Sequence, residues 1–474
     1  MKNLIIILFI AIGFTSCRKE LLNPIPQTSI SDAVAFQTPE RALQTVNGMY
    51  AAVKTGQFYG GRFLVYQDIR GEEFANRTNN GVTGFQTYNY TLTSGQNEVN
   101  NLWNAAYAAI NRINVVIAGL QTAPLTDAIK TQYTAEARFL RGLVYHSLAT
   151  LYARPFWDNN GEQYGLVIYT EPQSGSGGNS KARSTVPEVY NQIIADLNFA
   201  EANLPLTHSP ATLGVTRAHR NTAIALKTRV YLHMRRYNDV ITEANKIVSA
   251  AAPFTATTGV NHSLAPSIAS VFGSGGLTNE NIFSFPFTTL DLPGTQNSLN
   301  QYYSPSPGGN GDYALNTATG IVTNTSWTAT DARRTFNQVV SGQTWLRKWT
   351  ANTDNVPVIR YAEVLLNLAE ALARTNGLDT RAVALLNAVR KRSDPAVTLT
   401  PASATALIDM ILVERRIELL GEGFRSMDLL RLGLPLPTKP DVLSTVGTTE
   451  AQYIWPIPNG ELLVNKAAIP NPGY

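Results

Sequence analysis

The chain has 474 residues, of which 44% are hydrophobic and 15% are charged. This length is enough for a large buried core without covalent cross-links, and the charged fraction is low against the roughly 25% of an average globular chain. The formal net charge is only +4 and the basic residues are scattered, which argues against nucleic acid as a partner.

The first residues are typical of an export signal. Lys2 is followed by an apolar stretch over residues 4–14 and by small residues up to Cys17. The stretch is too short to span a bilayer as a helix and has the length of a signal-peptide core, so we expect residues 1–16 to be cleaved. The residues before Cys17 resemble a bacterial lipobox, and Cys17 is the only cysteine. We therefore expect Cys17 to carry a lipid anchor. The alternative is an ordinary secretory peptide with an incidental cysteine.

Hydrophobic periodicity predicts a mainly helical protein. The clearest helix runs over residues 361–374, with Tyr361 and Leu365 on its apolar face. Asn376-Gly377 is expected to end this helix, and Asp379 to cap the next one. The other predicted helices cover residues 38–54, 97–119, 126–153, 186–203, 217–235 and 238–250, and two or three more lie before residue 432.

A second helix pair is predicted over residues 223–234 and 237–248, joined only by Arg235-Arg236. Pairs of this kind resemble tetratricopeptide units, although they do not recur at a fixed period. We expect one solenoid-like helical scaffold that carries long insertions.

Two segments contrast with this scaffold because they are almost free of charge. Residues 76–97 contain Arg77 as their single charge, and residues 290–330 contain only Asp291 and Asp312. Both are rich in Asn, Thr, Ser and Gly and keep several aromatic residues. Because long loops are usually functional or disordered, and disorder disfavours aromatics, we expect ordered, functional loops.

Aromatic rings among amide and hydroxyl side chains suit neutral, hydroxyl-rich ligands such as oligosaccharides. Each ring could equally pack in the small core of its own loop, so the hypothesis depends on the group and not on one member. The candidate ligand contacts are Trp327, Tyr302, Tyr303, Phe85 and Tyr88.

The sequence offers little for catalysis. Its five histidines are scattered, and it has no metal-ligand spacing or nucleophile motif, so we expect no metal and no cofactor. Asp68, Glu72 and Glu73 precede the first charge-poor loop and are the candidate carboxylates of a glycosidase. Ordinary hydrogen bonding or ion pairing is the favoured interpretation of these three residues.

A charged cluster follows near the carboxyl terminus. The alternation of acidic and basic residues predicts a structural ion network that joins two helices around Gly421 and Gly423. An active site is the alternative. The residues concerned are Glu414, Arg415, Glu418, Glu422, Arg425, Asp428 and Arg431.

Several motifs in this order resemble the SusD/RagB family of outer-membrane nutrient-binding lipoproteins. They read LWNAAYAAINRINVVI at residues 102–117, AEARFLRGLVYHSLATLYARPFW at 135–157 and STVPEVYNQIIADL at 184–197. The region from residue 358 to 432 contains ALLNAVRKRS and ILVERRIELLGEGFRSMDLLRLG, and the chain ends in WPIPNGELLVNKAAIPNPGY. The resemblance therefore extends over nearly the whole chain.

The resemblance implies an all-helical fold, with four tetratricopeptide-like helix pairs on one side and a loop-rich ligand-binding side. It also implies a non-enzymatic protein at the outer membrane that covers a SusC-like TonB-dependent transporter. On this basis we expect a tether over residues 17–37 and a single domain over residues 38–474. The scaffold would lie mainly in 38–60, 97–250 and 357–432, and the insertions in about 61–96 and 251–356.

The resulting hypothesis is a lipid-anchored protein that captures an oligosaccharide and delivers it to the transporter. A peptide ligand, a surface glycosidase and a purely structural adaptor remain as alternatives. Family members displayed outside the cell are associated with an acidic run after the anchor, whereas Arg18-Lys19-Glu20 follows Cys17 here. An outward orientation is therefore the expectation, with the periplasmic leaflet as the alternative.

Overall fold

The computed structural model describes residues 34–158, 163–173, 180–273 and 277–474. It confirms the mainly helical fold. The helices that pack as pairs in the scaffold are α2 (Pro39–Val53), α5 (Asn97–Leu120), α6 (Asp127–Tyr152), α7 (Val186–Asn203), α9 (Arg220–His233), α10 (Tyr237–Ala244), α12 (Tyr361–Asn376) and α13 (Thr380–Ser393).

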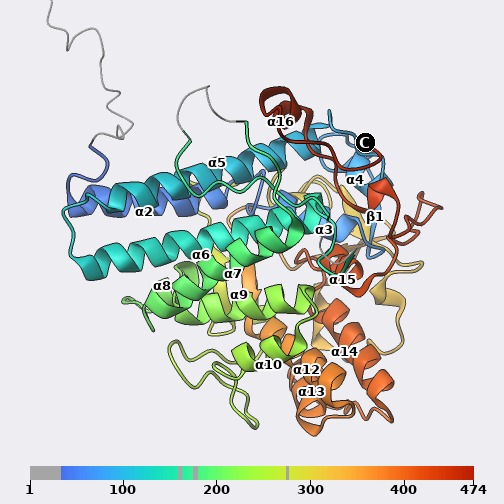
Figure 1. Cartoon of the computed structure of the whole chain (residues 1–474). Helices are drawn as coiled ribbons and strands as arrows, with labels where there is room; N and C mark the ends of the chain where they lie inside the picture. The colour runs from blue at the N-terminus through green and yellow to red at the C-terminus, as the bar shows by residue number, and fades with distance from the viewer. Residues whose placement is uncertain (1–33, 159–162, 174–179, 274–276) are drawn as a thin grey trace, which may run out of the picture.

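These helices pack as four consecutive pairs, α2 with α5, α6 with α7, α9 with α10 and α12 with α13. Each pair also contacts the next, through α5 with α6, α7 with α9 and α10 with α12. The pairs therefore follow one another from the top of the molecule to the bottom in Figure 1. The loop-rich segments lie along one side of this series.

Local sequence explains where the helices begin and end. The side chain of Asp379 accepts a hydrogen bond from the Ala382 amide at 2.9 Å, and Gly377 ends α12 with φ +78°. Thr185 and Glu188 form a capping box at the start of α7. The two predicted helix hairpins are both present, although α10 ends at Ala244 rather than near Val248.

The loop-rich side contains short elements. Its helices are α3 (Arg62–Ile69), α4 (Phe85–Asn89) and α11 (Leu299–Tyr303), and α14 (Ala404–Glu418) and α15 (Arg425–Leu432) follow the scaffold. Helices α8 (Leu213–Thr216) and α16 (Asn459–Val464) are also short. Three antiparallel pairs of strands join β1 (Phe74–Asn76) to β3 (Tyr313–Leu315), β2 (Asn281–Phe285) to β6 (Val356–Arg360), and β4 (Asn337–Val340) to β5 (Gln343–Leu346).

One hydrophobic core runs through both sides of the molecule. It includes scaffold residues such as Leu365 and Ile193 together with Tyr302 and Trp327 from the loop-rich side. The loops are therefore packed against the scaffold and are not merely attached to it. This shared core explains how long segments with little regular secondary structure hold a defined path.

Residues 1–16 and the expected lipid acceptor Cys17 lie outside the described residues. Within the described part of the chain, no helix combines the length and apolar character needed to cross a membrane.

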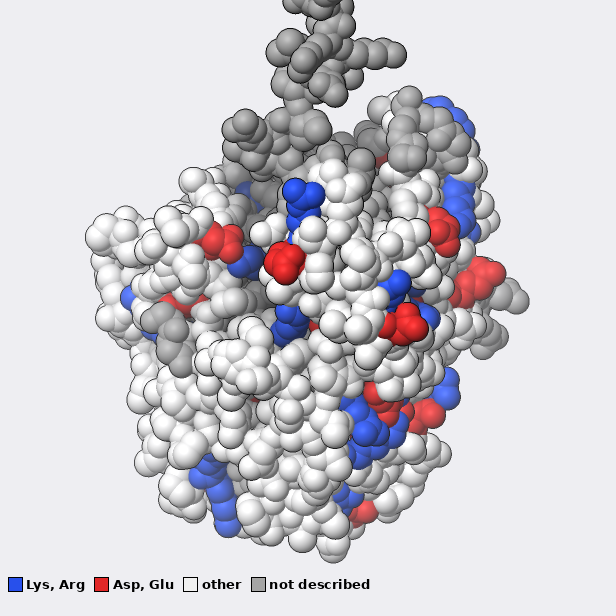
Figure 2. Space-filling model, turned by 90° about the vertical axis from the view of Figure 1, so that its left-hand side faces the viewer, with Lys and Arg blue, Asp and Glu red and all other residues white. Residues whose placement is uncertain are grey.

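One face of the molecule carries few charges. Figure 2 shows the face where α2 and α6 begin, and charged side chains appear there singly or in small groups of mixed sign. Most of this face is uncharged. This is consistent with the low charged fraction of the chain. The face shown in Figure 2 offers no extended basic or acidic area to a partner.

The turn between α14 and α15 approaches α3 closely at Gly423. This glycine has φ +81°, and a Cβ atom added to it would lie 2.8 Å from the Leu64 Cα. Its amide also donates to the Asp68 Oδ2 atom at 2.8 Å. Only glycine fits this position without displacing α3.

We therefore expect Gly423→Ala to lower stability by more than the strain of its backbone conformation alone. Gly342→Ala is the matched control because Gly342 has φ +74° but open space around it. The control should cost about 1–2 kcal/mol from left-handed strain, and Gly423→Ala about 1–3 kcal/mol more from the forced displacement. Chemical denaturation of both variants measures the difference, and equal losses would contradict the close approach.

Candidate functional site

The two charge-poor segments predicted to face a ligand meet in space. Strand β1 pairs with β3, so that Phe74 lies opposite Leu315 and Asn76 opposite Tyr313. The pairing continues beyond the strands, because the Arg77 amide donates to the Asp312 carbonyl at 2.8 Å. Parts of residues 76–97 and 290–330 thus lie side by side, whereas Asp291 near the start of the second segment pairs with Lys54 at the end of α2. We call the exposed surface of these two segments the loop face.

The exposed side chains of the loop face are mostly small and polar. They can donate and accept hydrogen bonds without carrying charge, which suits an uncharged polar ligand. The exposed hydroxyl and amide residues in these two segments include Thr78, Asn79, Thr91, Thr93, Ser306, Thr317, Thr319, Thr323, Thr325 and Ser326.

Four of the five predicted ligand-contacting aromatics lie in the interior. Tyr302 and Tyr303 are fully buried, and Tyr88 and Trp327 are no more than 2% exposed. Phe85 alone is half-buried at the start of α4. This corrects the expectation for the four buried rings, which form the core of their own loops.

The contacts of these rings show why they are buried. The Tyr303 ring stacks on Phe74 with 4.7 Å between centroids. The Trp327 ring lies 4.4 Å from the Arg334 guanidinium. The Tyr88 hydroxyl donates to the Pro440 carbonyl at 2.5 Å, which ties α4 to the carboxyl-terminal region. Each ring therefore orders the loop face from beneath.

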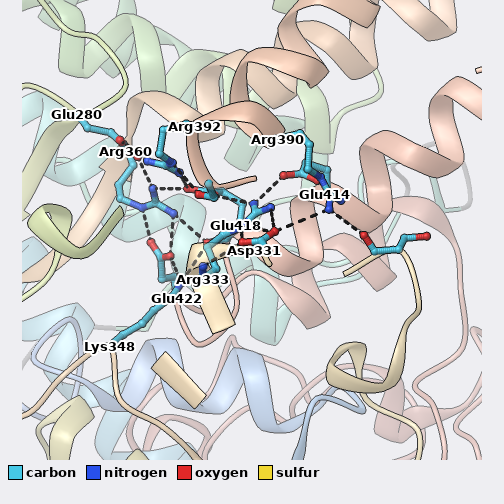
Figure 3. Close-up of polar contacts among 12 residues, drawn as sticks. Glu280, Asp331, Arg333, Lys348, Arg360, Arg390, Arg392, Glu414, Glu418 and Glu422 are labelled. Atoms are coloured by element: carbon cyan, nitrogen blue, oxygen red, sulfur yellow. Dashed lines mark hydrogen bonds and ion pairs between the residues drawn. The ribbon is translucent and has the colours of Figure 1, made fainter. Parts of the chain in front are cut away.

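A buried cluster of ion pairs joins side chains from α13, α14 and the start of α12, and we call it the central ion network (Figure 3). It contains five acidic and five basic side chains, none more than 4% exposed. Its members are Glu280, Asp331, Arg333, Lys348, Arg360, Arg390, Arg392, Glu414, Glu418 and Glu422.

Arg360 and Arg333 connect most of this network. Arg360 donates to Glu280 at 2.6 Å, to Glu418 at 2.8 Å and to Glu422 at 2.7 Å. Arg333 contacts Asp331 at 2.6 Å, Glu414 at 2.6 Å and Glu418 at 2.9 Å. The residues come from α13, α14, the start of α12 and the segments around β2, β4 and β5. The network therefore joins the scaffold to the loop-rich side.

The remaining residues of the predicted cluster are also paired. Asp428 accepts from Arg415 at 2.8 Å and from Arg431 at 2.7 Å, and Arg431 continues to Glu370 at 2.7 Å. Arg425 binds Glu72 at 2.6 Å. All seven predicted residues thus lie in ion pairs. Most of their partners lie elsewhere in the chain, and only the pairs that Arg415 and Arg431 make with Asp428 are internal to the predicted cluster.

The candidate glycosidase carboxylates are engaged in the same way. Glu72 binds Arg425 and Arg416, while the two oxygens of Glu73 accept from Arg416 at 2.7 Å and from the Ile321 amide at 2.6 Å. Asp68 Oδ2 accepts from the Gly423 amide and, at 3.2 Å, from the Tyr303 hydroxyl. Glu73 and Asp68 are buried. This arrangement favours the structural role for all three carboxylates.

Glu418 offers a test of the central ion network. Burial alone would raise the pKa of Glu418, but Arg392, Arg360 and Arg333 together hold it well below its ordinary value. Glu418→Ala leaves these three arginines short of a buried partner, so we expect a loss of about 3–5 kcal/mol in the free energy of unfolding. The exposed pair of Arg236 and Asp239 is the control, and Asp239→Ala should change stability by less than about 1 kcal/mol. Urea denaturation measures both, and similar losses would contradict the importance of the network.

Because of the buried Asp68, we expect the free energy of unfolding to depend on pH in an unusual way. Burial raises its pKa from 3.8 to about 7, although the Gly423 amide and Tyr303 hydroxyl favour the ionised form. A raised folded-state pKa means that stability is greatest below the unfolded pKa and is lost as the pH rises toward 7. Asp68→Asn removes this titration. Between about pH 5 and about pH 8, wild type should lose about 3 kcal/mol relative to the variant. Denaturation at both pH values gives the difference, and a constant difference would contradict the raised pKa.

Comparison with known proteins agrees with this architecture. Residues 228–474 match the family model described as the SusD family, and residues 26–232 match a model described as "Starch-binding associating with outer membrane". Among curated proteins, SusD-like protein P2 of Formosa agariphila is 25% identical, with 93% of each chain covered. SusD-like protein P38 of the same organism is 24% identical, with 96% of each chain covered.

Solved structures show the same fold. A SusD superfamily protein from Bacteroides fragilis is 32% identical, with a TM-score of 0.82, 91% of this chain covered and 99% of the other. A laminarin-binding SusD-like protein is 24% identical, with a TM-score of 0.73, 93% of this chain covered and 100% of the other. The match to the family model covers more than half of the sequence, and the chain therefore belongs to the SusD family.

Proposed function

We propose that this protein captures oligosaccharides at the outer membrane and delivers them to a SusC-like TonB-dependent transporter. Membership of the SusD family supports this role, as does the match of residues 26–232 to a model described as starch-binding and outer-membrane associated. Capture and delivery require binding without turnover. The engagement of Asp68, Glu72 and Glu73 in structural contacts is consistent with a non-catalytic protein.

The loop face is the observation that carries the proposal. Its two segments come from distant parts of the sequence, meet through β1 and β3, and present hydroxyl and amide groups with little charge. A neutral, hydroxyl-rich ligand can exchange hydrogen bonds with such a surface without the cost of stripping water from charged groups. The buried aromatic rings keep this surface in a fixed shape, which lowers the entropic cost of binding.

The position at the membrane completes the proposal. Cys17 would carry the lipid anchor after cleavage of residues 1–16, and residues 17–37 would serve as the tether. The four helix pairs would face the transporter, while the loop face would receive the ligand. A tether of this kind keeps the capturing domain at high local concentration beside its partner.

The ligand is proposed to be a glycan rather than a peptide because the loop face is poor in charge and rich in hydroxyl groups. A laminarin-binding protein is among the structural neighbours, which makes laminarin a reasonable first probe. Starch is the second probe, because of the description of the matched family model.

Calorimetry with laminarin and starch oligosaccharides tests capture directly. Phe85 is the half-buried aromatic of the loop face, and we expect Phe85→Ala to weaken binding by about two- to tenfold through loss of a ring contact. Leu206→Ala is the control, since Leu206 is 50% exposed on the turn that follows α7. It should leave affinity unchanged.

The outcomes separate the parts of the proposal. Unchanged affinity in Phe85→Ala would remove Phe85 from the site, whereas failure of wild type to bind any glycan while binding peptides would replace the ligand class. Release of new reducing ends from either glycan would show turnover and contradict a pure binding role.

A further inference from the structure

A pocket on the scaffold has the composition of a ligand site but lies apart from the loop face. We call it the α5 pocket. It has a volume of about 260 Å³ and lies between α5, α16 and the segment around Tyr169. Its lining residues include Trp103, Asn104, Tyr107, Asn111, Tyr169 and Glu461.

The pocket is on the opposite side of α5 from α4, although α16 in its wall contacts the end of the first charge-poor segment, where the Asn459 amide donates to the Ser94 carbonyl at 2.9 Å. Helical geometry places residues 103, 104, 107, 110 and 111 within an arc of about 120° on one side of α5. Glu98 projects from the other side, where its carboxylate accepts hydrogen bonds from the Gln86 amide at 3.2 Å and the Thr87 amide at 3.1 Å. A ligand in the α5 pocket therefore does not occupy the surface that Phe85 faces.

Three aromatic rings form the apolar part of the pocket. The Trp103 and Tyr107 rings lie 4.5 Å apart between centroids, at 34° to one another. The Tyr107 and Tyr169 rings lie 6.2 Å apart and nearly perpendicular, at 83°. Trp103 is only 2% exposed, whereas Tyr107 and Tyr169 are half-buried. Trp103 thus backs the pocket, and the two tyrosines offer ring surface to its interior.

The polar groups around these rings are held in place. Glu461 accepts from the Trp103 indole nitrogen at 3.3 Å and from the Asn465 amide at 2.7 Å. Asn111 is fixed by two hydrogen bonds to the main chain of Gln173, at 3.1 Å and 2.7 Å. The side-chain amide of Asn104 is exposed and has no hydrogen-bond partner among the residues that the structure describes. Fixed acceptors and a free amide are what a hydroxyl-bearing ligand requires.

The charges near the pocket select against anions. Glu461 is the carboxylate in its wall, and its negative charge contributes to raised pKa values for both Tyr107 and Tyr169, after burial and, for Tyr107, after Tyr145. Lys181 is a cation beside the pocket, where its amine lies 5.5 Å from the centroid of the Tyr169 ring and donates to the Ile168 carbonyl. A carboxylate-bearing sugar would meet Glu461 without a dedicated cation.

We propose that the α5 pocket binds one ring of a neutral saccharide, as a second carbohydrate contact on the helical scaffold. The half-buried faces of Tyr107 and Tyr169 would pack against the sugar ring. Asn104 and Glu461 would bond its hydroxyl groups. The volume is slightly below the roughly 300 Å³ at which pockets for larger ligands begin, so the pocket accepts a single ring. This site goes beyond the capture proposed above and does not depend on the loop face.

Nuclear magnetic resonance of the indole groups tests the proposal. The chain has six tryptophans, and the Trp103 indole is hydrogen-bonded to Glu461 in the wall of the pocket. A Trp103→Phe spectrum assigns its signal in the 15N-labelled protein. We expect maltotriose or laminaritriose at millimolar concentration to shift the Trp103 indole signal, and trigalacturonic acid to leave it in place.

Three variants define the site. Tyr169→Ala should weaken the affinity read from the Trp103 signal by about tenfold, and Asn104→Ala should weaken it several-fold while leaving the fold intact, because Asn104 is exposed. Tyr164→Ala is the matched control, since Tyr164 is 46% exposed in the same segment and does not line the pocket. It should bind like wild type.

Each outcome decides for or against the pocket. A Trp103 shift that is lost in Tyr169→Ala and kept in Tyr164→Ala supports it. No Trp103 shift with either neutral trisaccharide overturns it, as does a shift that persists unchanged in both Tyr169→Ala and Asn104→Ala. An equal response to trigalacturonic acid overturns the neutral class. If calorimetry shows that Phe85→Ala weakens saccharide binding while Tyr169→Ala and Asn104→Ala do not, the ligand binds at the loop face alone and the second site is overturned.

Discussion

The organisation of this molecule depends on charges that are buried between its helical scaffold and its loop-rich side. Arg360 begins α12 and at the same time binds three carboxylates that arrive from before β2, from α14 and from the turn that follows α14. Removing so many ions from water is costly, and the cost is offset only when each charge finds its partners. The central ion network therefore permits few alternative placements of the loop-rich side.

Two kinds of contact stabilise this arrangement in different ways. The continuous hydrophobic core supplies most of the favourable free energy, because it is non-directional and scales with buried area. Ion pairs and the close approach at Gly423 are directional, and they fix which loop lies against which helix. Solved structures that are 18–32% identical to this chain share its fold, which shows that very different side chains can fill the same arrangement.

The helices were largely predictable from the sequence because their signals are local. Each signal lies in the helix that it defines or directly beside it. Examples are the apolar face around Leu365, the glycine at position 377 and the cap at Asp379. The partners of Glu418 were not predictable, since Arg333, Arg360 and Arg392 come from separate segments. The charges of the cluster pointed to an ion network, but only the three-dimensional structure shows what it joins.

The aromatic residues of the loops illustrate the same limit. Composition cannot separate a ring that faces a ligand from one that packs beneath the surface, and the burial of Tyr303 depends on the approach of Phe74 from a segment far away in the sequence. The α5 pocket could not be predicted from the sequence for a related reason. Trp103 and Tyr107 lie in a predicted helix, but Tyr169 and Glu461 reach them only through the fold.

The buried ions also shape how the protein meets its surroundings. Only 15% of the residues are charged, and many of these charges neutralise one another inside the molecule. The outer surface that remains exerts little long-range electric field, as the scattered charges of Figure 2 illustrate. Encounters with an uncharged ligand are then governed by diffusion and shape, and their rate is insensitive to ionic strength. A protein exposed to a medium of changing salinity would keep the same rate of encounter.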